Sequence, residues 1–245
     1  MTRRRNLRAA IAMALAVVTG FLGEMPAGAQ ASTKTQEVPN TVWGHPNTGQ
    51  FMDGMGTWMY VAPGPAAKPG QVSRDGYQYL MSFAFPNLRI GYAGLATGPN
   101  GPVARIAMSD LFTGGAPIGA EVAYNWSPGH FYFVYVQHLT GGAIGAWVMD
   151  WETGVWTHIG TVHPPGDWGR MARGGKTLVS RWGAAEPADC AGYPIVDAYL
   201  FPVLGYTGSN FEVGVAVPGQ QVQPADCPTQ TEFLANGWVH YRLGT

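Results

Sequence analysis

The chain has 245 residues, among them 35 glycines, 19 prolines and nine tryptophans, and only 12% of it is charged. This composition is typical of an all-β protein with many turns and excludes a helical bundle, which needs Ala, Glu, Lys and Leu in a 3.6-residue repeat. The formal net charge is −1, and no basic cluster follows the first eight residues, which excludes a nucleic-acid-binding surface.

The first predicted element is an export signal over residues 1–31. Three arginines at positions 3 to 5 give a charged start, an apolar segment follows, and Ala29-Gln30-Ala31 is a small-x-small cleavage site. The apolar segment is shorter than the roughly 20 residues of a membrane-spanning helix. We therefore expect a secreted protein, cleaved near Ala31, with no membrane span.

The export route stays open between two alternatives. Arg3-Arg4 resembles a twin-arginine signal, but Asn6 stands where a large apolar residue is usual, so the general secretory route fits equally well. Cleavage removes four arginines and one glutamate, which changes the net charge from −1 to −4.

Residues 32–55 are polar and have no periodicity, so we expect a loosely attached arm before a single β domain over 56–245. Turn signals divide that domain into about a dozen short strands. This spacing predicts a β-sandwich of jelly-roll (concanavalin-like) type, with a closed barrel as the second choice. The strands are expected at 56–62, 77–85, 89–97, 102–110, 120–126, 177–182, 193–201, 211–217 and 237–243, with further strands between 130 and 160.

The segment HFYFVYVQHLTGGAIGAWVMDWETGVWTHIG, residues 130–160, is the most informative part of the chain. Side chains alternate between the two faces of a strand. One face of the first strand therefore carries Phe131, Phe133, Tyr135 and Gln137, and the other carries Tyr132, Val134, Val136 and His138. The second set is more aliphatic, which predicts that it faces the core. The first set then forms an aromatic outer face or lines a groove.

The next strand of this segment places Trp147, Met149 and Trp151 on one face. Residues 150–154, Asp-Trp-Glu-Thr-Gly, form a hairpin turn, because Asp can accept backbone hydrogen bonds and Gly tolerates a positive φ. Trp156 and His158 share a face of the returning strand. Aromatic faces with a few amides suit neutral glycans, although large aromatics also fill sandwich cores. The predicted ligand-binding residues are Phe131, Phe133, Tyr135, Gln137, Trp147, Trp151 and Trp156.

The stretch WVMDWETGVWTHIGTVHPP, with IGYAGLATGPNG and AYNWSPGHFYFVYVQ before it, resembles a family of exported bacterial and fungal proteins, domain of unknown function 3472. The shared pattern is a Gly-Tyr-x-Gly-Leu strand, a long aromatic strand and a Trp…Asp-x-x-Thr-Gly-x-Trp hairpin. The resemblance covers residues 77–182. It implies a β-sandwich module, often found beside domains thought to handle polysaccharide, and it transfers no catalytic residue.

Candidate catalytic groups are sparse. Asp150 and Glu152 share a face at a spacing that a pair of glycosidase carboxylates permits, but their place in a turn also fits capping. His138 and His158 could meet across strands, yet a zinc site would need a third ligand and no HxH or HExxH motif exists. Gln137 and His138 are adjacent, which puts them on opposite faces, unlike the Gln-x-His of some polysaccharide lyases. Asp110, Glu121 and Asp197 are further acids with no spacing argument. We predict no metal and no cofactor.

Cys190 and Cys227 are the only cysteines, and an exported chain favours one disulfide between them. The closed loop would stabilise the fold by about 4 kcal/mol. Each cysteine ends a Pro-Ala-Asp-Cys sequence, which indicates two similar turns; a pair of acidic turns that binds a cation is the alternative.

Three functional hypotheses follow from the sequence. The first is a secreted monomeric β-sandwich that binds environmental or cell-wall polysaccharide through an aromatic face. The second is a glycan hydrolase or lyase on the same scaffold. The third is an extracellular interaction or structural protein without a glycan ligand.

Overall fold

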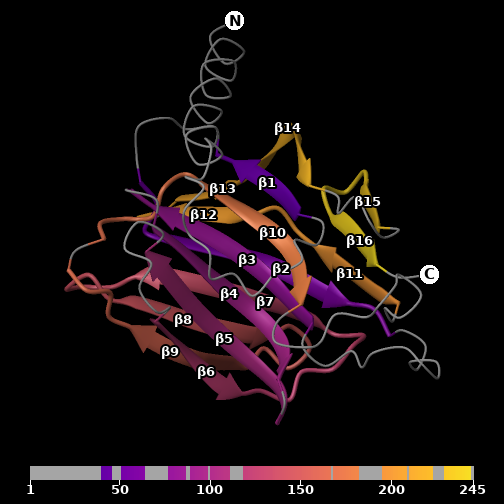
Figure 1. Cartoon of the computed structure of the whole chain (residues 1–245), viewed down its shortest axis with the longest axis horizontal. Helices are drawn as coiled ribbons and strands as arrows, with labels where there is room; N and C mark the ends of the chain where they lie inside the picture. Colours follow the sequence, from indigo (N-terminus) through magenta and orange to yellow (C-terminus); the bar gives the residue numbers. More distant parts are fainter. Residues whose placement is uncertain are drawn as a thin grey trace, which may run out of the picture.

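The computed structural model describes residues 40–45, 51–63, 77–86, 89–98, 100–110, 118–166, 168–181, 195–208, 210–222 and 229–243. The export signal, Cys190 and Cys227 lie outside these ranges, so the signal and the disulfide stay predictions. Within them the chain forms sixteen strands and no helix. The strands make two antiparallel sheets that lie one behind the other (Figure 1). The predicted β-sandwich is confirmed, and the closed barrel is wrong.

The first sheet has seven strands, in the order β14-β1-β10-β3-β4-β5-β6. The strands β3, β4, β5 and β6 follow one another in the chain and lie side by side in the sheet, which makes them a meander. The strands are β1 (Asn40–Gly44), β3 (Tyr77–Phe85), β4 (Arg89–Gly98), β5 (Gly101–Asp110), β6 (Ile118–Ala123), β10 (Gly174–Arg181) and β14 (Val215–Val222).

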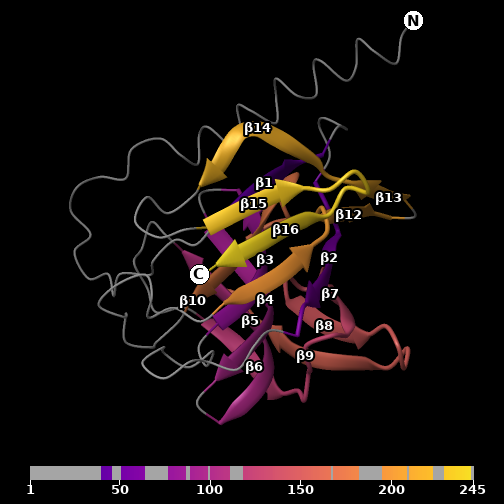
Figure 2. The same ribbon diagram turned by 90° about the vertical axis from the view of Figure 1, so that its right-hand side faces the viewer.

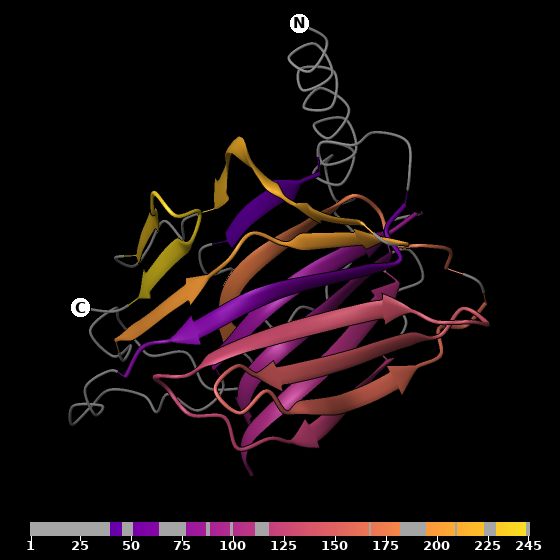
Figure 3. The ribbon, with the colours of Figure 1, turned by 180° about the vertical axis from the view of Figure 1, so that it is seen from behind.

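The second sheet follows the order β15-β16-β11-β2-β7-β8-β9, and the short hairpin β12–β13 adds to it beside β2. Figure 2 shows the two layers from the side, and Figure 3 shows β2, β7, β8 and β9 toward the viewer. The strands are β2 (Gly54–Val61), β7 (Phe131–His138), β8 (Ile144–Asp150), β9 (Trp156–Val162), β11 (Val196–Leu200), β12 (Leu204–Thr207), β13 (Asn210–Val213), β15 (Thr229–Phe233) and β16 (Val239–Leu243).

The core fills the space between the two sheets. Tyr132, Val134 and Val136 of β7 are buried in it, which confirms the predicted inward face of that strand. The sheets approach closely at the edge formed by β6 and β9. A Cβ atom at Gly160 of β9 would collide with the Cβ of Ala120 on β6, so glycine lets this edge close.

The predicted N-terminal arm is wrong for Asn40–Gly44. These residues form β1, a fully buried strand of the seven-stranded sheet, hydrogen-bonded between β10 and β14. The indole of Trp43 lies between the sheets and donates a hydrogen bond of 2.8 Å to the Thr177 hydroxyl. The domain therefore begins before residue 56.

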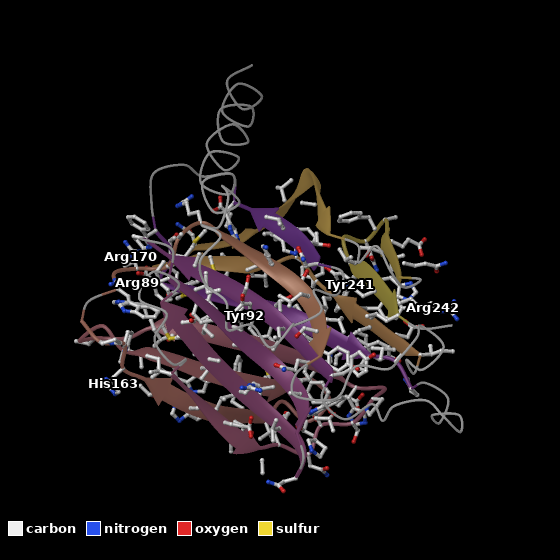
Figure 4. The ribbon with its side chains drawn as sticks, in the orientation of Figure 1. Arg89, Tyr92, His163, Arg170, Tyr241 and Arg242 are labelled. Carbon is white, nitrogen blue, oxygen red and sulfur yellow. The ribbon has the colours of Figure 1, made fainter. Side chains whose placement is uncertain are left out.

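A buried hydroxyl network joins the two sheets. Tyr241 of β16 donates to the Thr41 hydroxyl of β1 at 2.7 Å, and its oxygen lies 3.0 Å from the Thr177 hydroxyl of β10. Figure 4 shows Tyr241 within the body of the molecule and its neighbour Arg242 at the rim. Buried polar groups need such partners, so the network fixes how β16 sits against the opposite sheet.

Replacing Tyr241 by phenylalanine removes this donor and leaves the Thr41 hydroxyl in a dry site. We expect the free energy of unfolding to fall by about 1–3 kcal/mol, as for other buried hydrogen-bonding groups left without a partner. Urea unfolding measures the change. Tyr199→Phe is the matched control, because Tyr199 lies on the outer face of the sheet and outside the buried network. Equal effects of the two variants would contradict the role of the network.

Candidate functional site: an aromatic sheet face

The outer face of the nine-stranded sheet carries aromatic side chains on four neighbouring strands. The register places Trp58, Phe133, Met149 and Trp156 in one lateral row across β2, β7, β8 and β9. The next row along the strands holds Gly56, Tyr135, Trp147 and His158. We call the following eight residues the aromatic face: Trp58, Tyr60, Phe131, Phe133, Tyr135, Trp147, Trp151 and Trp156.

Glycines lie beneath three of these rings. A Cβ atom at Gly54 would collide with the ring of Tyr135, one at Gly56 with the ring of Phe133, and one at Gly145 with the ring of Trp147. The three rings therefore lie down over the backbone of the sheet and do not stand up from it. Glycine in a strand interior is unfavourable and often marks such a close approach.

The rings of Phe133, Tyr135 and Trp147 are neighbours with nearly parallel or moderately tilted planes. The planes of Phe133 and Tyr135 differ by 17°, with their centroids 6.3 Å apart. The planes of Tyr135 and Trp147 differ by 36° at the same centroid distance. Rings tilted so little from one another direct their faces toward the same side, which here is the solvent side of the sheet.

Two exposed tryptophans, Trp151 and Trp156, pack edge-on against neighbouring rings of the aromatic face. Trp151 meets Trp58 edge-on at 87°, and Trp156 meets Phe133 at the same angle. Their side chains are 59% and 50% exposed, far more than structural tryptophans usually are. Together with Phe131, which is also exposed, they give the aromatic face a large area open to a ligand.

The outward positions of the four strands of this face are uncharged. The outward positions of β2, β7, β8 and β9 carry no Asp, Glu, Lys or Arg side chain. Burial and the nearby Tyr206 and Asp53 raise the pKa of Tyr135 to about 12, so its hydroxyl keeps its proton at neutral pH. The polar groups available there include the Tyr135 hydroxyl, the Gln137 amide, the Trp147 indole N–H and the His158 imidazole.

A polar cluster borders the aromatic face on the side of β11 and β16. The imidazole of His240 stacks on Tyr199 with centroids 4.3 Å apart and planes 4° apart. Its Nε2 lies 2.6 Å from Asp197 Oδ1, and its Nδ1 lies 3.7 Å from Glu232 Oε2. Tyr199 connects the cluster to the aromatic face through Tyr60. Sequence reasoning named Asp197 but missed its partners, although strand parity puts Asp197 and Tyr199 on one face.

The acids of the β8–β9 turn, Asp150 and Glu152, make contacts within the turn itself. Asp150 Oδ1 accepts hydrogen bonds from the backbone N–H groups of Glu152 and Thr153, which is the capping role that the sequence also allowed. His130 Nδ1 lies 3.9 Å from the Asp150 carboxylate and 3.4 Å from the Glu152 carboxylate. The three side chains therefore fix the turn that carries Trp151.

His138 and His158 are not brought together. His138 has the parity of the buried Val134 and Val136, whereas His158 lies outward against the ring of Trp147, at 5.3 Å. The two imidazoles thus belong to opposite faces of the sheet. No three potential metal ligands converge within the described part of the chain. The described part of the chain also contains no helix long and apolar enough to cross a membrane.

Comparisons with known proteins show the fold but no family. No family model matches this chain, so the resemblance to domain of unknown function 3472 stays a prediction. No curated protein matches it either. Solved structures that are similar include scytalido-glutamic peptidase with a transition state analog inhibitor, at a TM-score of 0.53 and 8% identity, over 85% of this chain and 98% of the peptidase.

Two further structures have lower scores. Scytalido-glutamic peptidase with a peptide-based transition state analog gives a TM-score of 0.49 at 10% identity, over 86% of this chain and 100% of that one. SCP-B, a member of the Eqolisin family of peptidases in a complex with the tripeptide Ala-Ile-His, gives 0.47 at 10% identity, over the same shares. The likeness to the first of these three structures, at 8% identity, supports the β-sandwich scaffold alone, and none of the three carries a residue role to this chain.

Proposed function

We propose that this protein is secreted and binds carbohydrate, specifically environmental or cell-wall polysaccharide, through its aromatic face. The observation that carries the proposal is the row of solvent-facing rings over glycines, bordered by exposed tryptophans. Sugar rings have apolar C–H faces and polar edges. Flat aromatic rings match the C–H faces, and peripheral amide, hydroxyl and indole groups match the hydroxyl edges.

A protein with this role should bind insoluble or soluble neutral polysaccharide without releasing products. The direct experiment is a pull-down and affinity-gel panel with neutral and acidic polysaccharides, together with assays for reducing ends and unsaturated sugars. A denatured protein substrate belongs in the panel, because one similar fold is that of a peptidase. Turnover of any substrate would replace binding as the function, and failure of every glycan to bind would favour an interaction or structural role.

Trp147→Ala should lower the affinity for a bound polysaccharide by about tenfold or more. One lost ring contact of roughly 1.4 kcal/mol corresponds to tenfold, and buried Trp and Tyr contacts often exceed that. Affinity electrophoresis or calorimetry measures the change. Phe51→Ala is the control, because Phe51 is exposed but lies outside the aromatic face. Equal affinities of Trp147→Ala and the parent protein would contradict the assignment of the face.

The polar cluster around His240 favours a second candidate, a hydrolase or lyase on the same scaffold. Asp197 can hold the His240 tautomer that leaves Nδ1 as a base, which is the arrangement of a general base and its orienting carboxylate. The cluster lies beside the aromatic face, where a bound glycan could reach it. His240→Gln distinguishes an enzyme from a glycan-binding protein. The substitution abolishes product release if the polar cluster is catalytic, and it leaves glycan affinity unchanged if the protein only binds glycan through the aromatic face.

A further inference from the structure

The three glycines under the aromatic face allow three rings to lie flat on the sheet, so that a ligand can stack on the faces of these rings. Each outward glycine sits where a larger residue would lift a ring: Gly54 below Tyr135, Gly56 below Phe133 and Gly145 below Trp147. Gly56 and Gly145 lie within β2 and β8, where glycine weakens a strand, and Gly54 is the first residue of β2. An upright ring would present its edge to a ligand, whereas a ring that lies over a glycine presents its face. The glycines are needed if the ring faces themselves make the contact.

Only some sugars present an uninterrupted apolar surface on both faces of the pyranose ring. A pyranose whose substituents are all equatorial shows axial C–H groups on both faces. An axial hydroxyl at carbon two, as in mannose, or at carbon four, as in galactose, puts a polar group onto one face. A chain joined through equatorial bonds at carbons one and four is an extended ribbon whose successive residues turn opposite faces to the protein. An axial hydroxyl would therefore meet the rings at every second residue, whereas a fully equatorial chain can lie on successive rings from Trp147 through Tyr135 to Phe133.

The absence of charge restricts the ligand further. The outward positions of β2, β7, β8 and β9 carry no Asp, Glu, Lys or Arg. The carboxylates at the border already have partners, because Asp53 pairs with Arg170 and Asp197 with His240. The rings themselves therefore offer no charge to compensate the carboxylate of a uronic acid or the ammonium of a free amino sugar. We infer that the aromatic face recognises a neutral, equatorially linked and equatorially substituted polysaccharide, a cellulose-type glucan or its acetamido counterpart, in preference to mannan, galactan or polyuronate. This inference rests on the proposed function.

The first test compares glycans on the unmodified protein. Cello-oligosaccharides, manno-oligosaccharides and galacto-oligosaccharides of equal length are titrated calorimetrically, with an oligogalacturonide as the charged probe. We expect binding of the cello-series at least tenfold tighter than binding of the others. Equal binding of all neutral series would overturn the inference but keep the proposed function. Binding of none of the polysaccharides or oligosaccharides would remove the proposed function itself.

The second test lifts one ring without removing it. In Gly145→Ala the added Cβ meets the distal edge of the Trp147 ring, which must tilt upward. We expect the affinity for the cello-series to fall about tenfold while affinity for the manno-series changes little, so the preference between the two is reduced. Gly98→Ala is the matched control, since its Cβ would meet only ordinary contacts in the other sheet. An unchanged preference in Gly145→Ala would overturn the inference.

A second copy of the chain is the competing occupant of this face. Light scattering across a concentration series, on the parent protein and on Gly145→Ala, distinguishes self-association from glycan binding as the role of the aromatic face. A dimer that the substitution dissociates would assign the face to self-association and overturn the glycan inference. A monomer in both samples, together with the expected glycan preference, supports it.

Discussion

Replacing Trp43 by alanine is expected to lower the free energy of unfolding by about 3–5 kcal/mol, the range for large aromatic residues removed from a core. Trp43 is 2% exposed, donates a hydrogen bond to Thr177 and meets the ring of Phe233 edge-on at 6.2 Å. The substitution leaves a cavity between β1, β10 and β15 and removes the donor to a buried hydroxyl. Urea or thermal unfolding of the two proteins measures the loss.

Phe211→Ala serves as the control for this prediction. Phe211 is a large aromatic residue on the β12–β13 hairpin but is 67% exposed, so its removal should change the stability by less than about 1 kcal/mol. If Trp43→Ala behaved like Phe211→Ala, residues 40–44 would not be part of the cooperative fold, and the description of β1 as a central strand would be contradicted.

The difference between β1 and the predicted arm has a clear cause. A strand is recognised in a sequence by alternation over several residues, and Asn-Thr-Val-Trp-Gly is too short and too polar to show it. Its burial depends on two strands more than a hundred residues away, β10 and β14, and on Tyr241, which partners Thr41. Such long-range pairing leaves no local signal in the chain.

The faces of β7 were predictable because both of its neighbours are in the same sheet and one side is dry. Alternation then fixes Tyr132, Val134 and Val136 inward and Phe133 and Tyr135 outward. The glycines beneath the rings were not predictable, because Gly54 and Gly56 lie on β2, about eighty residues from the rings they support. Their meaning depends on cross-strand register, which the sequence does not reveal. The same limit hid the pairing of Asp197 with His240.

The possible meeting of His138 with His158 fails because of a local irregularity in strand pairing. His138 and His158 are near each other in a strand diagram, and unbroken pairing of β8 with β9 would put both on the inner face of the sheet. The β-bulge between Ala146 and Trp147 shifts the register of β9 and leaves His158 outward, opposite Trp147. The histidine with the strongest structural consequence was His45, which lies in the segment assigned to the arm and carried no motif.

Acidification from pH 6.5 to pH 4 is expected to remove about 3 kcal/mol of stability through His45 alone. Burial lowers the pKa of this imidazole from 6.5 to about 4; the hydrogen bond to the Val203 carbonyl opposes that shift, and the positive charge of Arg173 adds to it. His45 is 2% exposed and is therefore held neutral in the folded protein. The unfolded chain takes up a proton at this site below pH 6.5 while the folded protein does not, so stability falls by about 1.4 kcal/mol for each pH unit.

Urea unfolding at pH values between 4 and 7, on the parent protein and on His45→Gln, isolates this contribution. The glutamine keeps a side-chain donor that can reach the Val203 carbonyl but cannot titrate, so the other acids and histidines contribute equally to both proteins. We expect the variant to be less stable at pH 7 and to lose less stability on acidification, and the two curves to converge as the pH approaches 4. Parallel curves would show that His45 does not stay neutral in the fold, and a steeper curve for the variant would reverse the sign of the linkage.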